Sequence, residues 1–164
     1  MRRRELKKGW FKPIFICGLI IGLITIDFFI KRWVNSDLFE SINVWQNTFG
    51  ISFNIQYVTN RGAAWGMLAS FFKPLLVIRI FVIFGLVFYL WKESFSLKKS
   101  FPFLLILAGA LGNVLDSFLY GHVIDMFHFT FGGKSYGIFN LADAMIFLGC
   151  LGLIFTPKKT VHAN

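Results

Sequence analysis

Long apolar runs alternate with short polar stretches along this chain of 164 residues. The four apolar runs cover about residues 13–30, 74–91, 101–119 and 138–155. As helices, runs of this length approach the minimum needed to cross about 30 Å of hydrocarbon. The pattern therefore predicts an integral membrane protein, an all-α bundle of four transmembrane helices that forms a single membrane domain over residues 1–164.

The stretch between the first two runs, about residues 35–73, is more polar and has no helical period. Its residues 51–59 alternate instead, which is typical of a half-buried β-strand. One face carries Ile51, Phe53, Ile55 and Tyr57, and the other carries Ser52, Asn54 and Gln56. We expect a small extracytoplasmic β element here, followed by a turn of small residues at 60–66. Trp45 and Trp65 would lie in the headgroup region.

Composition supports the membrane assignment, because only 15% of the residues are charged and 56% are hydrophobic. A soluble domain usually has about 25% charged residues. Most of the 17 Lys and Arg residues precede the first apolar run or follow the second and fourth. Those ends would share one side, so the positive-inside rule predicts that both termini are cytoplasmic. This distribution also argues against nucleic acid as the partner that explains the net charge of +9.

When this topology is traced, the polar residues of the spans gather near the outer interface. They are Asp27, Asn113, Asp116, Asp125, Asn140 and Asp143, together with the turn that begins at Asn60. Carboxylates at membrane depth are costly and usually functional. His122 and His128 are isolated, and Cys17 and Cys150 lie inside apolar runs, so we predict no metal site and no disulfide.

Each of these residues also has a structural explanation. Asp27 and Lys31 share a helical face, and we interpret them as an interfacial ion pair that anchors the helix end. Asn140 and Asp143 resemble an N-cap followed by an acid at N3. Asn113 and Asp116, one turn apart, could hydrogen-bond between helices. Asp125 could be a loop carboxylate in water, although its immediate neighbours in the sequence are apolar.

The chemical interpretation pairs Asp125 with Asp143. Two carboxylates held close together share a proton, so that one activates water while the other polarises or protonates an amide. The chain has no H-E-x-x-H for zinc and no G-x-S-x-G for a serine nucleophile. A proton-coupled carrier that uses the same carboxylates remains an alternative, as does a non-catalytic lipid-binding scaffold.

Four motifs in order resemble those of the lipoprotein signal peptidases, or signal peptidase II, over essentially the whole chain. Residues 27–31 resemble D-x-x-x-K, and residues 60–65 resemble N-x-G-A-A-F with Trp65 in place of Phe. Residues 112–116 resemble G-N-x-x-D and are followed by Asp125, and residues 139–143 resemble F-N-x-A-D. Each motif falls at the expected end of its span.

The resemblance implies an aspartic endopeptidase of the bacterial cytoplasmic (inner) membrane with Asp125 and Asp143 as catalytic residues. It would cut a prolipoprotein just before a diacylglyceryl-modified cysteine, on the periplasmic side, in contact with membrane lipid. The residues that would bind the substrate or support the dyad are Asn60, Gly62, Asn113, Asp116 and Asn140. The family uses no metal or organic cofactor, and we expect a monomer.

The chain departs from the family at Ser117, where the residue after G-N-x-x-D is usually Arg. A guanidinium that could hold a substrate carbonyl or a neighbouring carboxylate is therefore missing at that position. We hypothesise that another cation, Arg61 or Arg79, compensates for it, or that the site works with a water instead. By sequence alone, Arg79 lies near the outer end of its span, where it can snorkel to the interface.

Overall fold

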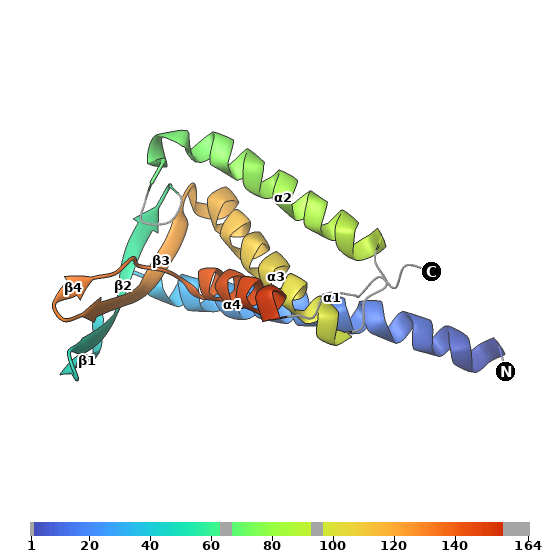
Figure 1. Ribbon diagram of the computed structural model, residues 1–164. Helices are drawn as coiled ribbons and strands as arrows, with labels where there is room; N and C mark the ends of the chain where they lie inside the picture. The colour runs from blue at the N-terminus through green and yellow to red at the C-terminus, as the bar shows by residue number, and fades with distance from the viewer. Residues whose placement is uncertain (1, 63–66, 93–96, 156–164) are drawn as a thin grey trace.

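The computed structural model describes residues 2–62, 67–92 and 97–155 (Figure 1). Its helices are α1 (Arg2–Val34), α2 (Phe72–Lys92), α3 (Leu97–Tyr120) and α4 (Leu141–Phe155), with a 3₁₀ turn at Ala69–Phe71. Its strands are β1 (Ile42–Thr48), β2 (Ile51–Asn60), β3 (Val123–Phe131) and β4 (Lys134–Ser135). The second half of the predicted turn, Ala63 to Gly66 with Trp65, lies outside the described residues.

The helices alternate in direction, and the sheet lies at one end of them (Figure 1). α1 and α3 run towards the sheet, whereas α2 and α4 run away from it. α3 is the central helix, because half of its apolar segment is buried against 6% for that of α2. Large apolar side chains on the outer helix faces are exposed, as expected for surfaces in contact with lipid. Examples are Phe29, Val77, Phe81, Phe84 and Phe147.

Three of the four predicted spans correspond to helices that are long and apolar enough to cross a membrane. The fourth corresponds to α4, whose 15 described residues reach about 22 Å at 1.5 Å per residue. That is shorter than about 30 Å of hydrocarbon, so a fourth crossing stays a prediction. The helix begins slightly after the predicted bound of about residue 138. Phe139 pairs with Phe127 of β3, and the helix begins only at Leu141.

The four strands form one antiparallel sheet in the order β1-β2-β3-β4. β2 confirms the strand predicted at 51–59. The sheet extends beyond the predicted range 35–73, however, because β3 and β4 follow α3 in sequence. β3 was not predicted, although its residues 127–131 alternate between phenylalanine and a polar residue. Only its first four residues are all buried. In the register between β2 and β3, Asn60 lies opposite Val123 and Val58 lies opposite Asp125.

Aromatic rings cover one part of this sheet. The ring of Phe53 on β2 stacks on that of Phe129 on β3 at 4.4 Å, and Phe139 stacks on Phe129 at 6.0 Å. Phe139 is thus held to β3 by both its backbone pairing and its ring. The segment that leads into α4 is therefore fixed against the central strands.

A buried cation joins the helices at their sheet end. The Lys31 side chain has no exposed surface, and its ammonium lies 2.7 Å from both Asp27 and Asp116. The backbone N–H of Ala142 donates to Asp27, and that of Ile124 donates to Asp116. The predicted structural ion pair of Asp27 and Lys31 is confirmed, but it is buried, and through Asp116 and the two backbone donors it connects α1 to α3, α4 and β3.

We expect Lys31→Met to destabilise the fold by about 3–5 kcal/mol, because it leaves two carboxylates buried without their cation. Arg32→Met is the matched control, since Arg32 is the next residue on α1 and its side chain is exposed. Thermal unfolding in detergent compares the two variants with the wild type. Equal unfolding temperatures for both variants would contradict a structural role for the buried cation.

Candidate active site

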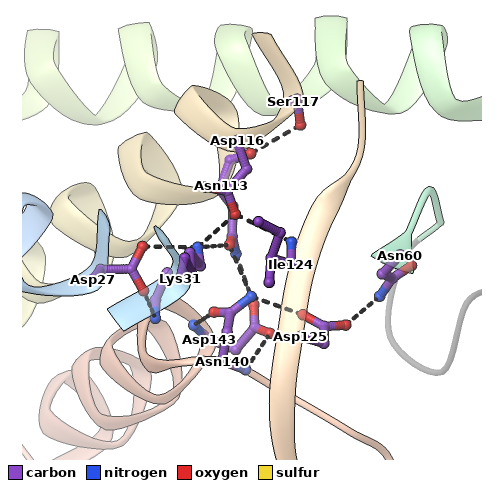
Figure 2. Close-up of polar contacts among 11 residues, drawn as sticks. Asp27, Lys31, Asn60, Asn113, Asp116, Ser117, Ile124, Asp125, Asn140 and Asp143 are labelled. Carbon is purple, nitrogen blue, oxygen red and sulfur yellow. Dashed lines mark hydrogen bonds and ion pairs between the residues drawn. The ribbon is translucent and has the colours of Figure 1, made fainter. Parts of the chain in front are cut away.

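Most of the polar residues singled out in the sequence meet where the sheet contacts α3 and α4 (Figure 2). Asp125 comes from β3, Asn113 from α3, and Asp143 from the first turn of α4. Asn60 ends β2, and Asn140 directly precedes α4. Residues from four separate parts of the chain thus form one hydrogen-bonded cluster.

Asp125 lies on an inner strand of the sheet with only 2% of its surface exposed. Its Oδ1 accepts a hydrogen bond from Asn140 Nδ2 at 2.8 Å, and its Oδ2 accepts one from Asn60 Nδ2 at 2.9 Å. Burial raises the pKa of Asp125 to about 6, and the charge of Asp143 acts in the same direction. The two amide donors oppose that rise, because they stabilise the ionised form.

Asp143 makes two sets of hydrogen bonds, one that caps α4 and one with the polar cluster. Its N–H donates to Asn140 Oδ1 at 2.8 Å, and its Oδ2 accepts from the Asn140 N–H at 3.3 Å. This reciprocal pair is the capping geometry that the sequence suggested. The other carboxylate oxygen accepts from Asn113 Nδ2 at 2.7 Å. Asp143 therefore caps α4 and also belongs to the polar cluster.

Asn140 and Asn113 connect the two aspartates. Asn140 is fully buried, and its Nδ2 donates to Asn113 Oδ1 as well as to Asp125. Asn113 Oδ1 accepts a second hydrogen bond from the Lys31 ammonium at 3.1 Å. The amide network thus extends from the buried cation to both carboxylates, and its donors and acceptors fix the orientation of each amide.

Gly112, the glycine before Asn113, is required by close packing. A Cβ at this position would lie 2.7 Å from Asp27 Oδ2, so a larger residue would displace that carboxylate. Asp27, Lys31 and Asp116 hold the helices behind Asn113 and do not line the cavity described next. Of the residues that the sequence predicted to support the site, Asp116 therefore belongs to this structural group.

Both aspartates line one cavity of about 580 Å³. Its other walls are mostly apolar and include Ile138, Phe139, Ile146 and Phe147. A second cavity of about 640 Å³ also reaches Asp125, and Asn60 and residues 136–138 line both cavities. Asp125 therefore lies where an apolar space meets a second space lined by the β2 end and Ser135.

Arg79 of α2, one of the two cations hypothesised to replace the missing arginine, also lines the first cavity. Its side chain is half-buried, and Nη2 donates to the backbone carbonyl of Gly62 at 2.8 Å. It therefore does not simply extend to the interface as a snorkelling residue would. The Gly62 N–H in turn donates to Asn60 Oδ1 at 2.8 Å. Arg79 and Asn60 are thus fixed to the same tight turn.

Ser117, which stands where the family usually has Arg, makes a hydrogen bond within its own helix. Ser117 is buried, and its hydroxyl donates to the Asn113 carbonyl at 2.9 Å, one helical turn back. The adjacent carboxylate of Asp116 already has the Lys31 ammonium as its partner. Of the two hypothesised substitutes, Arg79 lines the cavity with both aspartates, and Arg61 lines the second cavity.

Within the described ranges, no group of three His, Cys, Asp or Glu residues could hold a metal ion.

Comparisons with known proteins agree on one family. The family model described as "Signal peptidase (SPase) II" matches residues 19–157. The lipoprotein signal peptidase of Gloeothece citriformis is 34% identical, with 96% of each chain covered, and that of Wigglesworthia glossinidia brevipalpis is 32% identical over 85% of this chain and 92% of the relative. The Chlamydia pneumoniae relative is 41% identical, and the match covers 63% of each chain.

Two solved structures of bacterial membrane enzymes share the fold. One has a TM-score of 0.76 and 26% identity, and the match covers 92% of this chain and 94% of the other. The second has a TM-score of 0.75 and 27% identity, with 90% and 94% covered. The resemblance inferred from the four motifs is therefore confirmed. The chain belongs to the signal peptidase II family of membrane proteases.

Proposed function

We propose that this protease removes the signal peptide from prolipoproteins by cutting just before a diacylglyceryl-modified cysteine. Asp125 and Asp143 would form the catalytic dyad. The observation that carries this proposal is that both carboxylates line the same cavity, and that neither has a cation as a hydrogen-bond or ion-pair partner among the described residues. A proton can then pass between them and a substrate without breaking an ion pair.

The environments of the two aspartates support different roles for them. Asp143 lies at the N-terminus of α4, where the helix dipole favours a negative charge. Burial and the charge of Asp143 favour the protonated form of Asp125. Asp143 therefore takes a proton from a water molecule, whose oxygen attacks the scissile carbonyl carbon. Asp125 donates its proton towards the amide, and the C–N bond breaks to give a free carboxyl group and the amino group of the cysteine.

The surroundings of the dyad suit a substrate held partly in lipid. The mostly apolar first cavity would accept the signal peptide segment near the scissile bond, while the acyl chains stay in the bilayer. The second cavity would accept the residues that follow the cysteine. In this proposal the site faces the periplasmic side of a bacterial inner membrane, both termini are cytoplasmic, α4 completes the fourth crossing, and the chain acts as a monomer.

The carrier and scaffold alternatives gain no specific support. A relay across the membrane needs acids at several depths, whereas Asp27, Asp116, Asp125 and Asp143 all lie near the sheet end of the bundle (Figure 2). A scaffold would give no reason for two carboxylates to share one cavity. We therefore retain the hydrolytic function alone.

Asp125→Asn and Asp143→Asn should each reduce cleavage by about a thousandfold or more, because the dyad acts as a unit. The measurement is cleavage of a diacylglyceryl-modified prolipoprotein by purified protein in detergent. Asp143→Asn keeps an oxygen that can accept from the Asn140 N–H, so the cap of α4 should survive and the unfolding temperature should change little. Substantial cleavage by either folded variant would falsify the dyad.

The pH dependence tests the division of roles. Asp125 with a pKa of about 6 is protonated below that pH and ionised above it, so kcat/KM should fall as the pH rises through about 6. Asn60→Ala removes a donor that stabilises the ionised form, and should move this fall to higher pH. If kcat/KM instead rises with pH through this range, Asp125 acts as the base and the assigned roles are reversed.

A further inference from the structure

The two terminal guanidinium nitrogens of Arg79 differ in their contacts. Nη2 is held by the Gly62 carbonyl at 2.8 Å. Nη1 is buried, and it has no hydrogen-bond partner among the residues that the structure describes. A charged group within a transmembrane helix is costly unless its donors are satisfied. A donor without a partner beside a cavity therefore indicates that a bound ligand supplies the hydrogen-bond acceptor.

The chemistry of the cavity restricts what that group can be. Asp125 and Asp143 line the same space, so an anionic ligand such as a phosphate would be repelled by at least one carboxylate. A neutral oxygen acceptor meets no such repulsion. The substrate class proposed above offers two neutral acceptors close to its scissile bond, namely peptide carbonyls and the ester carbonyls of the diacylglyceryl group.

The anchor of Arg79 also fixes its position relative to the catalytic carboxyl. The turn at residues 60–62 accepts from Arg79 through the Gly62 carbonyl, and its Asn60 side chain donates to Asp125. One tight turn thus sets the positions of the free Nη1 and of Asp125 together. A carbonyl bound by Arg79 would therefore have a defined position relative to the dyad.

We propose that Arg79 is a substrate-binding residue whose Nη1 donates to a carbonyl oxygen of the lipidated segment, so that α2 supplies the guanidinium that Ser117 cannot. This inference rests on the proposed function for the identity of the substrate. Ser117 has its hydroxyl committed to the Asn113 carbonyl and does not line the cavity. The two acceptors differ only in whether the carbonyl belongs to the peptide or to the lipid ester.

Binding of a lipopeptide tests the proposal without requiring turnover. The probe is a diacylglyceryl-cysteine peptide whose scissile nitrogen is methylated, which slows cleavage and keeps every carbonyl. We expect Arg79→Met to raise its Kd about 10- to 100-fold, as for a lost hydrogen bond from a charged donor. Lys73→Met, an exposed cation of the same helix, is the matched control and should leave the Kd unchanged.

A second probe with ether-linked chains, which lacks the ester carbonyls, identifies the acceptor. If Arg79→Met weakens binding of the ester probe but not of the ether probe, the acceptor is the lipid ester. If it weakens both equally while the unfolding temperature and the pH dependence of cleavage are unchanged, the acceptor is a peptide carbonyl. Both results support the proposal.

Two results would overturn it. One is an unchanged Kd for both probes in Arg79→Met. The other is an equal weakening together with a lower unfolding temperature or a shifted pH profile, which would assign Arg79 to holding the turn at residues 60–62. Failure of the proposed function is recognised separately, because wild-type protein would then not cleave the unmethylated ester-linked lipopeptide, whereas the Kd comparison can still be made.

Discussion

The Lys31 ammonium is the contact on which the arrangement of this protein depends. Removing a cation from water costs several kcal/mol, and the cost is offset only if its partners are placed accurately. Here the partners are two carboxylates and the Asn113 amide, and each carboxylate also accepts from a backbone N–H, Asp27 from α4 and Asp116 from β3. Any other arrangement of the helices against the sheet would therefore leave a buried charge unpaired.

This arrangement divides the carboxylates of the membrane region into two kinds. Asp27 and Asp116 contact the ammonium directly, so their role is to hold charge in a fixed place. The side chains of Asp125 and Asp143 accept from asparagine amides and, for Asp143, from a backbone N–H. An amide donor orients a carboxylate with less electrostatic preference for the ionised form than a cation exerts. In the proposed mechanism, that difference leaves the second pair free to exchange protons.

Local patterns in the sequence were sufficient for the helices and one strand. The predicted spans at 74–91 and 101–119 and the strand at 51–59 lie within α2, α3 and β2. β3 was missed because the segment around Asp125 could be interpreted as a loop, although residues 127–131 alternate between phenylalanine and a polar residue. The apolar run at 138–155 begins before α4, because Ile138 and Phe139 are apolar but Phe139 forms a bridge to Phe127. The N-cap pattern at Asn140 gave the helix start correctly.

For the candidate site, the sequence indicated which residues gather at one end of the bundle but not how they are connected. Lys31 and Asp116 are far apart in the chain, so no spacing rule could show that they form an ion pair. For Arg79 the sequence left two roles open, contact with the interface or replacement of the missing arginine, and could not choose between them. Its distance from the helix end suggested contact with the interface, whereas the turn that binds its guanidinium comes from a separate segment.

The side chain of Asn140 has a consequence for when this protease becomes active. Its Oδ1 caps α4, while its Nδ2 holds Asp125 of β3, so the helix start and the inner strand are completed by the same residue. A newly inserted chain whose sheet has not yet docked lacks this link, and its two aspartates are not held together. If they act as proposed, immature copies are inert. Cleavage of lipidated substrates would then begin only after the sheet has docked on the helices.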